Sequence, residues 1–207
     1  MPNQQAQPTC CAVILAGGRN TRMDGRNKAF LVVGGKTILD RLIGTLQPFF
    51  SEILLVTRQL ELYADRPVHV VPDIYPARSS LTGIHAGLTY AMADFAFVAP
   101  CDAPFIKPAL IQALLAEIEP GVDVVVPVVN DYFEPLCAIY SKRCLAPIEA
   151  QLNRNDFKVT RFFEHVRLKT VSLEKIKKVD ARMSSFFNVN TPAALKASRD
   201  FENQVDE

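Results

Sequence analysis

The sequence of 207 residues predicts an α/β fold in which a mostly parallel, twisted β-sheet carries helices on both faces. Two observations predict it. Short, continuous apolar runs, typical of strands buried on both faces of a sheet, recur along the chain. They alternate with segments whose apolar residues recur at helical spacing. Strands that alternate with helices in this way build a parallel sheet through crossover connections.

The chain is expected to fold as one Rossmann-like domain. The chain is long enough for a single domain with a substantial hydrophobic core, and no repeat, low-complexity tract or linker divides it. We expect residues 1–9 to be a disordered polar tail and residues 10–205 to be the domain.

The predicted strands are short and apolar. They cover residues 11–16, 53–57, 68–71, 95–99, 122–127, 134–140 and 168–173, with a further extended piece at 30–33 that ends in a turn at Gly34-Gly35. The run 134–140 follows a turn at Asn130-Asp131, so we expect this one strand to return antiparallel.

The predicted helices lie between these runs. The clearest spans 38–50, because its apolar residues recur at helical spacing and Thr37 precedes it as an N-cap, with Asp40 three residues later. Further helices are predicted at 59–64, 84–93, 108–117, 141–152, 160–165 and 193–203. Residues 72–83 are expected to form a long loop, and long loops after strands often carry function.

Composition excludes several classes of partner. The chain has 23 basic and 22 acidic residues, so it lacks the broad positive surface of proteins that bind nucleic acid or anionic membranes. No apolar stretch approaches the roughly 18 residues that span a bilayer, and the polar N-terminus does not resemble a secretory signal. The five cysteines form no C-x-x-C pair. We therefore expect a cytoplasmic protein with buried thiols.

The first strand leads into a candidate phosphate site. The apolar run 12–16 stops at Gly17-Gly18 and passes into a basic loop that contains Arg22 and Lys28. Glycines let backbone N–H groups approach an anion, and the two cations would supply countercharge. The loop matches neither G-x-x-x-x-G-K-[ST] nor G-x-G-x-x-G, which disfavours P-loop and dinucleotide-binding folds.

Polar residues also follow the next three strands, at Thr57, Asp73 and Asp102. In such sheets ligands lie beyond the carboxyl ends of the strands. Asp102 stands between two prolines and is the expected Mg²⁺ ligand, since Mg²⁺ takes one or two carboxylates together with phosphate oxygens and water; the alternative is a helix N-cap. Asp73 is either a ligand contact or the start of an Asx turn.

The chemistry implied is nucleotidyl transfer. A nucleoside triphosphate at this edge would undergo in-line attack on its α-phosphorus, with pyrophosphate leaving, while Mg²⁺, Lys28 and Arg22 neutralise charge. The three histidines are isolated in the sequence, and no Ser-His-Asp or Cys-His arrangement suggests a protein nucleophile.

The motifs together resemble those of the molybdenum cofactor guanylyltransferases. The first is Leu15-Ala16-Gly17-Gly18 followed by Arg22-Met23, Gly25 and Lys28. Four more follow in order along nearly the whole chain, at residues 81–88, 100–105, 134–136 and 187–192. The resemblance implies a nucleotide-diphospho-sugar transferase-like fold. It also implies transfer of GMP from Mg-GTP to molybdopterin, which forms molybdopterin guanine dinucleotide and releases pyrophosphate.

The resemblance also implies a role for each matching residue. The nucleotide would be bound by Leu15, Ala16, Gly17, Gly18, Lys28, Asp73, Gly83 and Asp102. Catalysis would rest on Arg22, Lys28 and Asp102, with Mg²⁺ on Asp102. The acceptor would meet Glu134, Asn188 and Asn190, although Glu134 also fits a strand-edge charge and the two asparagines fit turn chemistry.

Three positions depart from the family pattern, namely Asp24, Asn27 and Thr57. An asparagine that assists guanine recognition often stands at the position of Thr57, so the departure bears on base specificity. Ala16-Gly17-Gly18 favours guanine, because cytidylyl relatives usually read Ala-Ala-Gly.

The alternatives are cytidylyl or other nucleotidyl transfer to molybdopterin or another phosphorylated metabolite, and a non-catalytic carrier of pterin or nucleotide. Transient contact with molybdoenzymes or cofactor chaperones would accompany the activity.

Overall fold

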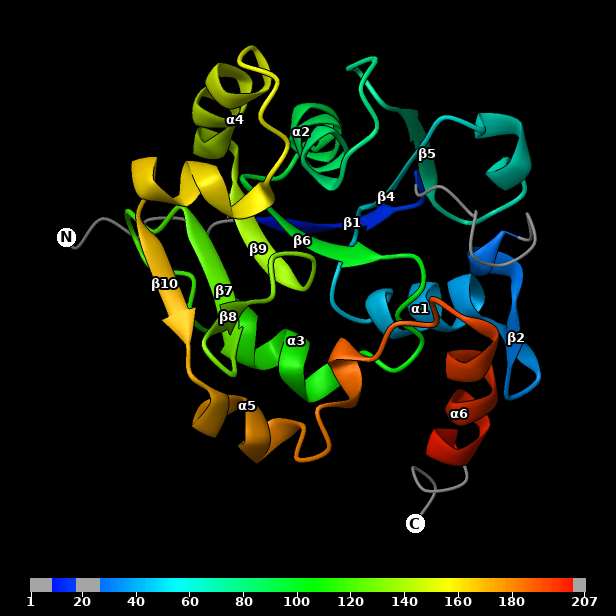
Figure 1. The fold of residues 1–207 in the computed structure, drawn as a ribbon. Coiled ribbons are helices and arrows are strands. Elements are labelled where there is room, and N and C mark those ends of the chain that lie inside the picture. The colour runs from blue at the N-terminus through cyan, green and yellow to red at the C-terminus, as the bar shows by residue number, and fades with distance from the viewer. Residues whose placement is uncertain (1–8, 18–26, 203–207) are drawn as a thin grey trace, which may run out of the picture.

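The computed structural model describes residues 9–17 and 27–202. One large sheet runs through the middle of the protein, and helices lie on both of its faces (Figure 1). Its strands are β1 (Cys10–Leu15), β4 (Ile53–Thr57), β5 (His69–Pro72), β6 (Phe95–Pro100), β7 (Val124–Val129), β8 (Tyr132–Phe133), β9 (Ala138–Ser141) and β10 (Leu168–Val171). The strand order is β10-β7-β9-β6-β1-β4-β5, and β8 pairs with β7.

The sheet is mostly parallel, as predicted. The strand β1 pairs in parallel with β4 and β6, β4 with β5, and β7 with β10. The strand β9 runs antiparallel to both β6 and β7, which confirms the return predicted for 134–140. The short strand β8 is a further antiparallel partner of β7 that the sequence analysis did not predict.

Helices divide between the two faces. They are α1 (Ile38–Leu46), α2 (Ser80–Tyr90), α3 (Pro108–Leu115), α4 (Leu145–Leu152), α5 (Leu173–Val179) and α6 (Pro192–Glu202). Short 3₁₀ helices are η1 (Lys28–Phe30), η2 (Leu60–Tyr63), η3 (Lys142–Cys144), η4 (Val159–His165) and η5 (Ser184–Phe186). A small hairpin of β2 (Val32–Val33) and β3 (Lys36–Thr37) turns at Gly34 and Gly35, whose φ angles are 57° and 74°.

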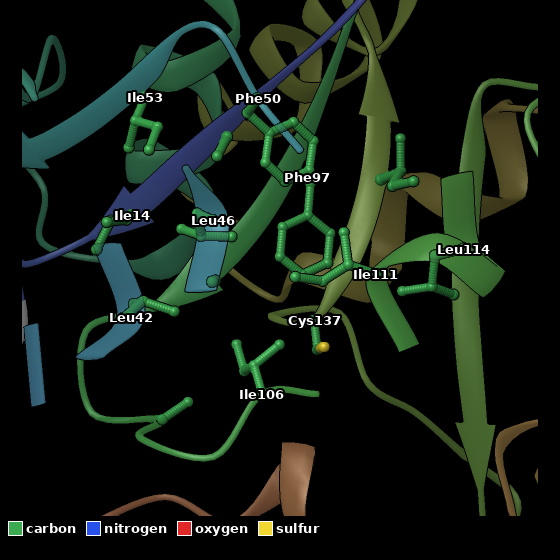
Figure 2. Packing of buried hydrophobic residues seen from close by; sticks show 14 of the residues in the cluster. Ile14, Leu42, Leu46, Phe50, Ile53, Phe97, Ile106, Ile111, Leu114 and Cys137 are labelled. Carbon is green, nitrogen blue, oxygen red and sulfur yellow. The ribbon is translucent and has the colours of Figure 1, made fainter. Parts of the chain in front are cut away.

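Each face of the sheet has its own apolar core. On one face, apolar residues of α1, α3 and α5 form one cluster with Ala12 and Ile14 of β1, and Phe97 of β6 stacks on Phe50 with ring centroids 5.7 Å apart (Figure 2). On the other face, apolar residues of α2 and α4 form a cluster with Cys11 and Val13. Successive residues of a strand point to opposite faces, so β1 is buried on both sides and anchors the fold.

Helix α2 packs especially close to β1. A Cβ atom built on Gly87 would lie 2.5 Å from Cγ1 of Val13, closer than atoms can approach without movement. Glycine at this position therefore permits the close helix-to-strand packing that brings the start of α2 to the end of β1.

The carboxyl ends of four parallel strands align at one edge of the sheet. Leu15 of β1 is level with Val56 of β4 and Pro100 of β6, and Thr57 is level with Pro72 of β5. The segments that follow these strands therefore share one edge.

Several predicted boundaries were wrong. Helix α1 ends at Leu46, because Pro48, two residues later, has no backbone N–H to continue the helical hydrogen bonds. Helix α2 begins at Ser80 rather than residue 84, since Ser79 and Thr82 form a capping box. The strand predicted at 168–173 ends at Val171, and the unpredicted helix α5 begins two residues later.

Other differences concern the type and length of elements. The segments predicted as helices at 59–64 and 160–165 are 3₁₀ helices, and strand β9 begins only at Ala138. The predicted tail lies outside the described residues except for Thr9, whose amide and hydroxyl donate to Asp94. Within residues 9–17 and 27–202, no helix has the length and apolar character needed to cross a bilayer.

Candidate functional site

A cavity of about 390 Å³ opens at the aligned edge of the sheet. It is lined by segments that follow β1, β4, β5 and β6, by the start of α2, and by residues that precede β9 and α6. The lining residues are Leu15, Ala16, Gly17, Asn27, Lys28, Val56, Thr57, Asp73, Arg78, Ser79, Ser80, Gly83, Pro100, Cys101, Asp102, Leu136, Asn188 and Asn190. Most of the residues predicted for the site are therefore brought together.

The backbone after β1 forms the middle of the cavity. The amide of Ala16 donates to the carbonyl of Val56 at 2.9 Å, and the amide of Cys101 donates to the carbonyl of Leu15 at 3.1 Å. These bonds hold the segment between β4 and β6. A Cβ atom on Gly17 would meet nothing within 4 Å, so the space beside this backbone is open. Gly18 and Arg22, which were predicted to continue the site, lie outside the described residues.

A cation and a carboxylate meet at the end of β6. The Nζ atom of Lys28 lies 3.5 Å from Oδ2 of Asp102 and donates to Oδ1 of Asn190 at 2.5 Å. The backbone carbonyl of Asp102 accepts from the amide of Val189 at 2.8 Å, and Val189 is fully buried. The segment before α6 is thus anchored next to Asp102.

Burial raises the pKa of Asp102 above its ordinary value, and the nearby Lys28 ammonium opposes that rise. Among the described residues, no group of three or more His, Cys, Asp or Glu side chains could hold a metal ion. A single carboxylate in this cavity fits Mg²⁺ that arrives with a nucleotide, because that ion keeps several water and phosphate ligands. Burial also raises the pKa of the neighbouring Cys101 thiol to about 12, which keeps it protonated and unsuited as a nucleophile.

Asp73 lies at the other end of the cavity, after β5. Its side chain is only 8% exposed. Its Oδ2 atom accepts from the hydroxyl of Thr82 at 3.0 Å and lies 3.7 Å from Nη2 of Arg58. Its Oδ1 atom is buried and has no hydrogen-bond partner among the described residues.

Two of the positions that depart from the family pattern have structural roles. Thr57 is 1% exposed, and its hydroxyl donates to the carbonyl of Ala16 at 3.5 Å while accepting from the amide of Gln59 at 3.1 Å. The Asn27 side chain caps η1 and donates to the hydroxyl of Tyr63 at 2.8 Å. Asp24 lies outside the described residues.

The acceptor residues predicted from the motifs divide into two groups. Asn188 and Asn190 line the cavity, whereas Glu134 does not, and Leu136 lines it instead. Glu134 is half-buried, and burial raises its pKa. Its role toward an acceptor stays a prediction.

Sequence reasoning missed two features of the site. One is the wall formed by Arg78, Ser79 and Ser80, where the Ser79-x-x-Thr82 capping pattern could have placed the helix start at the cavity. The other is Arg58, which touches the segment after β5 and carries no motif signal beyond its place directly after a strand.

A family model described as the MobA-like NTP transferase domain matches residues 12–171, which is more than half of the chain. The chain belongs to the MobA-like NTP transferase family. This confirms the family predicted from the motifs, and the chain is therefore a nucleotidyltransferase. The matched range includes Asp73 and Asp102 but ends before Asn188 and Asn190.

The names of curated relatives of this MobA-like NTP transferase agree with the family assignment. A molybdenum cofactor guanylyltransferase of Desulfosudis oleivorans is 38% identical over 194 residues, covering 90% of this chain and 96% of that protein. A probable molybdenum cofactor guanylyltransferase of Pelotomaculum thermopropionicum is 39% identical over 187 residues, covering 90% of each chain.

Solved structures show the same fold. The molybdopterin-guanine dinucleotide biosynthesis protein A of Archaeoglobus fulgidus superposes with a TM-score of 0.82 at 28% identity, covering 93% of this chain and 98% of that one. A nucleotidyl transferase from Methanothermobacter superposes with a TM-score of 0.72 at 18% identity, covering 95% and 99% of the two chains. The second likeness concerns the fold alone.

Proposed function

We propose that this chain transfers GMP from Mg-GTP to molybdopterin, releasing pyrophosphate and forming molybdopterin guanine dinucleotide. One observation carries the proposal: Lys28 contacts both Asp102 and Asn190, which is 162 residues away in the sequence, beside the open backbone after β1. A cation and a partly buried carboxylate next to exposed backbone suit a metal-bound polyphosphate. Relatives named molybdenum cofactor guanylyltransferase support the identity of the nucleotide and acceptor.

In this proposal the phosphates lie between Gly17 and Lys28, with Gly18 and Arg22 of the following loop adding donors and charge. Asp102 would hold Mg²⁺, which supplies charge neutralisation and polarises the α-phosphate when bound. Lys28 would leave Asp102 for a phosphate oxygen. The protein would thus contribute positioning and electrostatic stabilisation rather than a covalent nucleophile.

The nucleoside would occupy the opposite end of the cavity, near Leu15, Ala16, Gly83 and Asp73. Strands β5 and β6 are separated by β4 and β1, so Asp73 and Asp102 stand about three strand spacings apart, or about 14 Å. One Mg²⁺ ion, whose ligands lie about 2 Å from it, could not contact both carboxylates. We therefore assign Asp102 to the metal and Asp73 to the nucleoside.

Asn188 and Asn190 would meet the acceptor. An oxygen of its terminal phosphate would bond to the α-phosphorus of GTP, the bond from that phosphorus to the bridging oxygen would break, and pyrophosphate would leave with the electron pair. Delivery of the product to molybdoenzymes or cofactor chaperones belongs to the same proposal. We place the reaction in the cytoplasm, where a reducing environment would keep the five free cysteines as thiols.

The test follows the fate of each phosphate. With GTP labelled on the α-phosphate, the label should appear in a product that also contains the pterin. With GTP labelled on the γ-phosphate, the label should appear in pyrophosphate. A chain that binds GTP and molybdopterin but moves neither label would be a carrier, and the proposed activity would be wrong.

A further inference from the structure

The segment between β5 and α2 forms one wall of the cavity without regular secondary structure. We call residues 73–79 the β5–α2 loop; Asp73, Arg78 and Ser79 of this loop line the cavity. A loop without a hydrogen-bond ladder still needs partners for its backbone carbonyl groups. What holds those carbonyls decides the orientation of Asp73.

Arg58 provides these partners from outside the cavity. Its Nη2 atom donates to the carbonyl of Tyr75 at 2.6 Å and to the carbonyl of Ala77 at 2.7 Å. The same atom lies 3.7 Å from Oδ2 of Asp73. Arg58 directly follows Thr57, the last residue of β4, so the sheet fixes its backbone. One guanidinium thus donates to two carbonyls of the loop and places its positive charge near Asp73.

Thr82 cannot replace Arg58 in this role. Its hydroxyl has one proton, whereas three acceptors lie within reach: the carbonyls of Ser79 and Ala77, at 2.9 and 3.3 Å, and Oδ2 of Asp73, at 3.0 Å. Without Arg58, the buried Asp73 carboxylate would also lose a nearby positive charge, and an unpaired buried charge is strongly unfavourable.

The remaining oxygen of Asp73 lacks a hydrogen-bond partner among the described residues. In the described part of the chain, three buried side-chain atoms have no hydrogen-bond partner: Oδ1 of Asp73, Nδ1 of His85 and Oε1 of Gln151. Of these three residues, Asp73 lines the cavity. Because buried acceptors are nearly always satisfied in native proteins, a ligand that donates a hydrogen bond is expected at Oδ1.

We propose that Arg58 is a positioning residue for the nucleoside. It holds the β5–α2 loop and Oδ2 of Asp73, so that Oδ1 faces the cavity as an acceptor for an N–H or O–H group of the base or ribose. Arg58 itself does not line the cavity and acts through Asp73. The inference rests on the proposed function, because it takes the ligand to be a nucleotide.

The test compares Arg58→Ala and Arg58→Lys in the full chain. Arg58→Ala should raise the KM for GTP at least tenfold and leave kcat at saturating GTP within about threefold, because Lys28 and Asp102 at the phosphate end are untouched. Inhibition by pyrophosphate should stay within twofold. Arg58→Lys keeps a positive charge near Asp73 but lacks the planar fork of arginine, so its KM should lie between those of Arg58→Ala and the native chain.

The control is Arg66→Ala, which removes an arginine that pairs with Asp40 away from the cavity. Its KM for GTP should equal that of the native chain. A second control compares the single variant Asp73→Asn with the double variant that carries both Arg58→Ala and Asp73→Asn. If Arg58 acts through Asp73, the double variant should bind GTP within twofold of Asp73→Asn alone.

The outcomes separate this inference from the proposed function. A native KM in Arg58→Ala overturns the positioning role and leaves guanylyl transfer standing. Weaker pyrophosphate inhibition together with a lower melting temperature would mean a general loss of structure, and it also overturns the inference. A native chain to which GTP does not bind, measured by calorimetry, would overturn both.

Discussion

The ammonium of Lys28 lies 3.5 Å from the carboxylate of Asp102, and the two side chains are 15% and 16% exposed. Each group partly neutralises the other in a confined space. A Mg-nucleotide would offer a better partner to each group, because its metal would bind the carboxylate and its phosphates would bind the ammonium. Under the proposed function, this ion pair would be the state of the two side chains before the Mg-nucleotide binds.

Replacing Lys28 should damage both binding and chemistry. We expect Lys28→Ala to lower kcat/KM for GTP by about 100-fold or more, the effect typical of removing one group that stabilises transition-state charge. Lys28→Arg keeps the charge and should retain more activity. Lys36→Ala, which changes an exposed lysine of β3, is the matched control in steady-state assays. Equal activity of Lys28→Ala and Lys36→Ala would contradict this role.

The nucleoside end should select guanine. Oδ1 of Asp73 is an acceptor without a partner in the described part of the chain. Guanine offers both a ring N–H and an amino group, whereas cytosine offers only its amino group. We expect Mg-GTP to bind at least tenfold more tightly than Mg-CTP, a difference of about 1.4 kcal/mol in calorimetric titration. Affinities within twofold of one another would show that the base is not read at this site.

Glu134 should make stability depend on pH. Burial raises its pKa above the ordinary 4.5, so the folded protein holds this proton more tightly than the unfolded chain does. The free energy of unfolding therefore falls as the pH rises from the ordinary pKa to the raised pKa of the folded protein, and it stays lower above that range. Glu134→Gln should be more stable than the native chain at pH 7 and about equally stable at pH 4, as measured by urea unfolding.

An exposed glutamate serves as the control for that comparison. Glu164→Gln should shift the free energy of unfolding little at either pH, since its side chain faces solvent. If the native chain is more stable than Glu134→Gln at pH 7, Glu134 has a stabilising partner, and its burial is not the dominant effect.

The close packing of α2 on β1 should be sensitive to one methyl group. Gly87→Ala would place Cβ 2.5 Å from Val13, and we expect it to lower the free energy of unfolding by about 1–3 kcal/mol. Adding Val13→Ala should make the Gly87→Ala change less costly than it is in the native background. Gly44→Ala in α1, where a Cβ meets nothing within 4 Å, should instead stabilise by about 0.5–1 kcal/mol. Denaturant unfolding measures the free energy of unfolding of each variant. A Gly87→Ala variant as stable as the native chain would contradict the close packing.

Local chemistry predicted much of the fold. Strand β4 was predicted at its observed bounds, and Thr37 caps α1 as expected, since both depend on neighbouring residues alone. The start of α2 was missed because two nearby prolines suggested a loop, while Ser79 and Thr82 already formed a cap. Helix α5 was missed because the strand predicted at 168–173 was extended through Ser172, which is the N-cap of this helix.

The candidate site was harder to predict from residues alone. Glycines and acidic residues at strand ends located the edge of the sheet, because parallel strands end together. The contact between Lys28 and Asn190 joins residues 162 positions apart. The motif resemblance had assigned both residues to one site, but it did not predict this contact. Arg58 has no periodic or motif signal, so its bonds to the carbonyls of Tyr75 and Ala77 emerge only when the loop has folded.

Pyrophosphate release from Mg-GTP in the presence of molybdopterin tests the central claim most directly. The comparison is Asp102→Ala, at the carboxyl end of β6, with Asp94→Ala, which removes an exposed carboxylate next to the other end of the same strand. We predict a measurable rate in the native chain and in Asp94→Ala, and loss of that rate in Asp102→Ala. An inactive native chain, or an Asp102→Ala variant as active as Asp94→Ala, would contradict it.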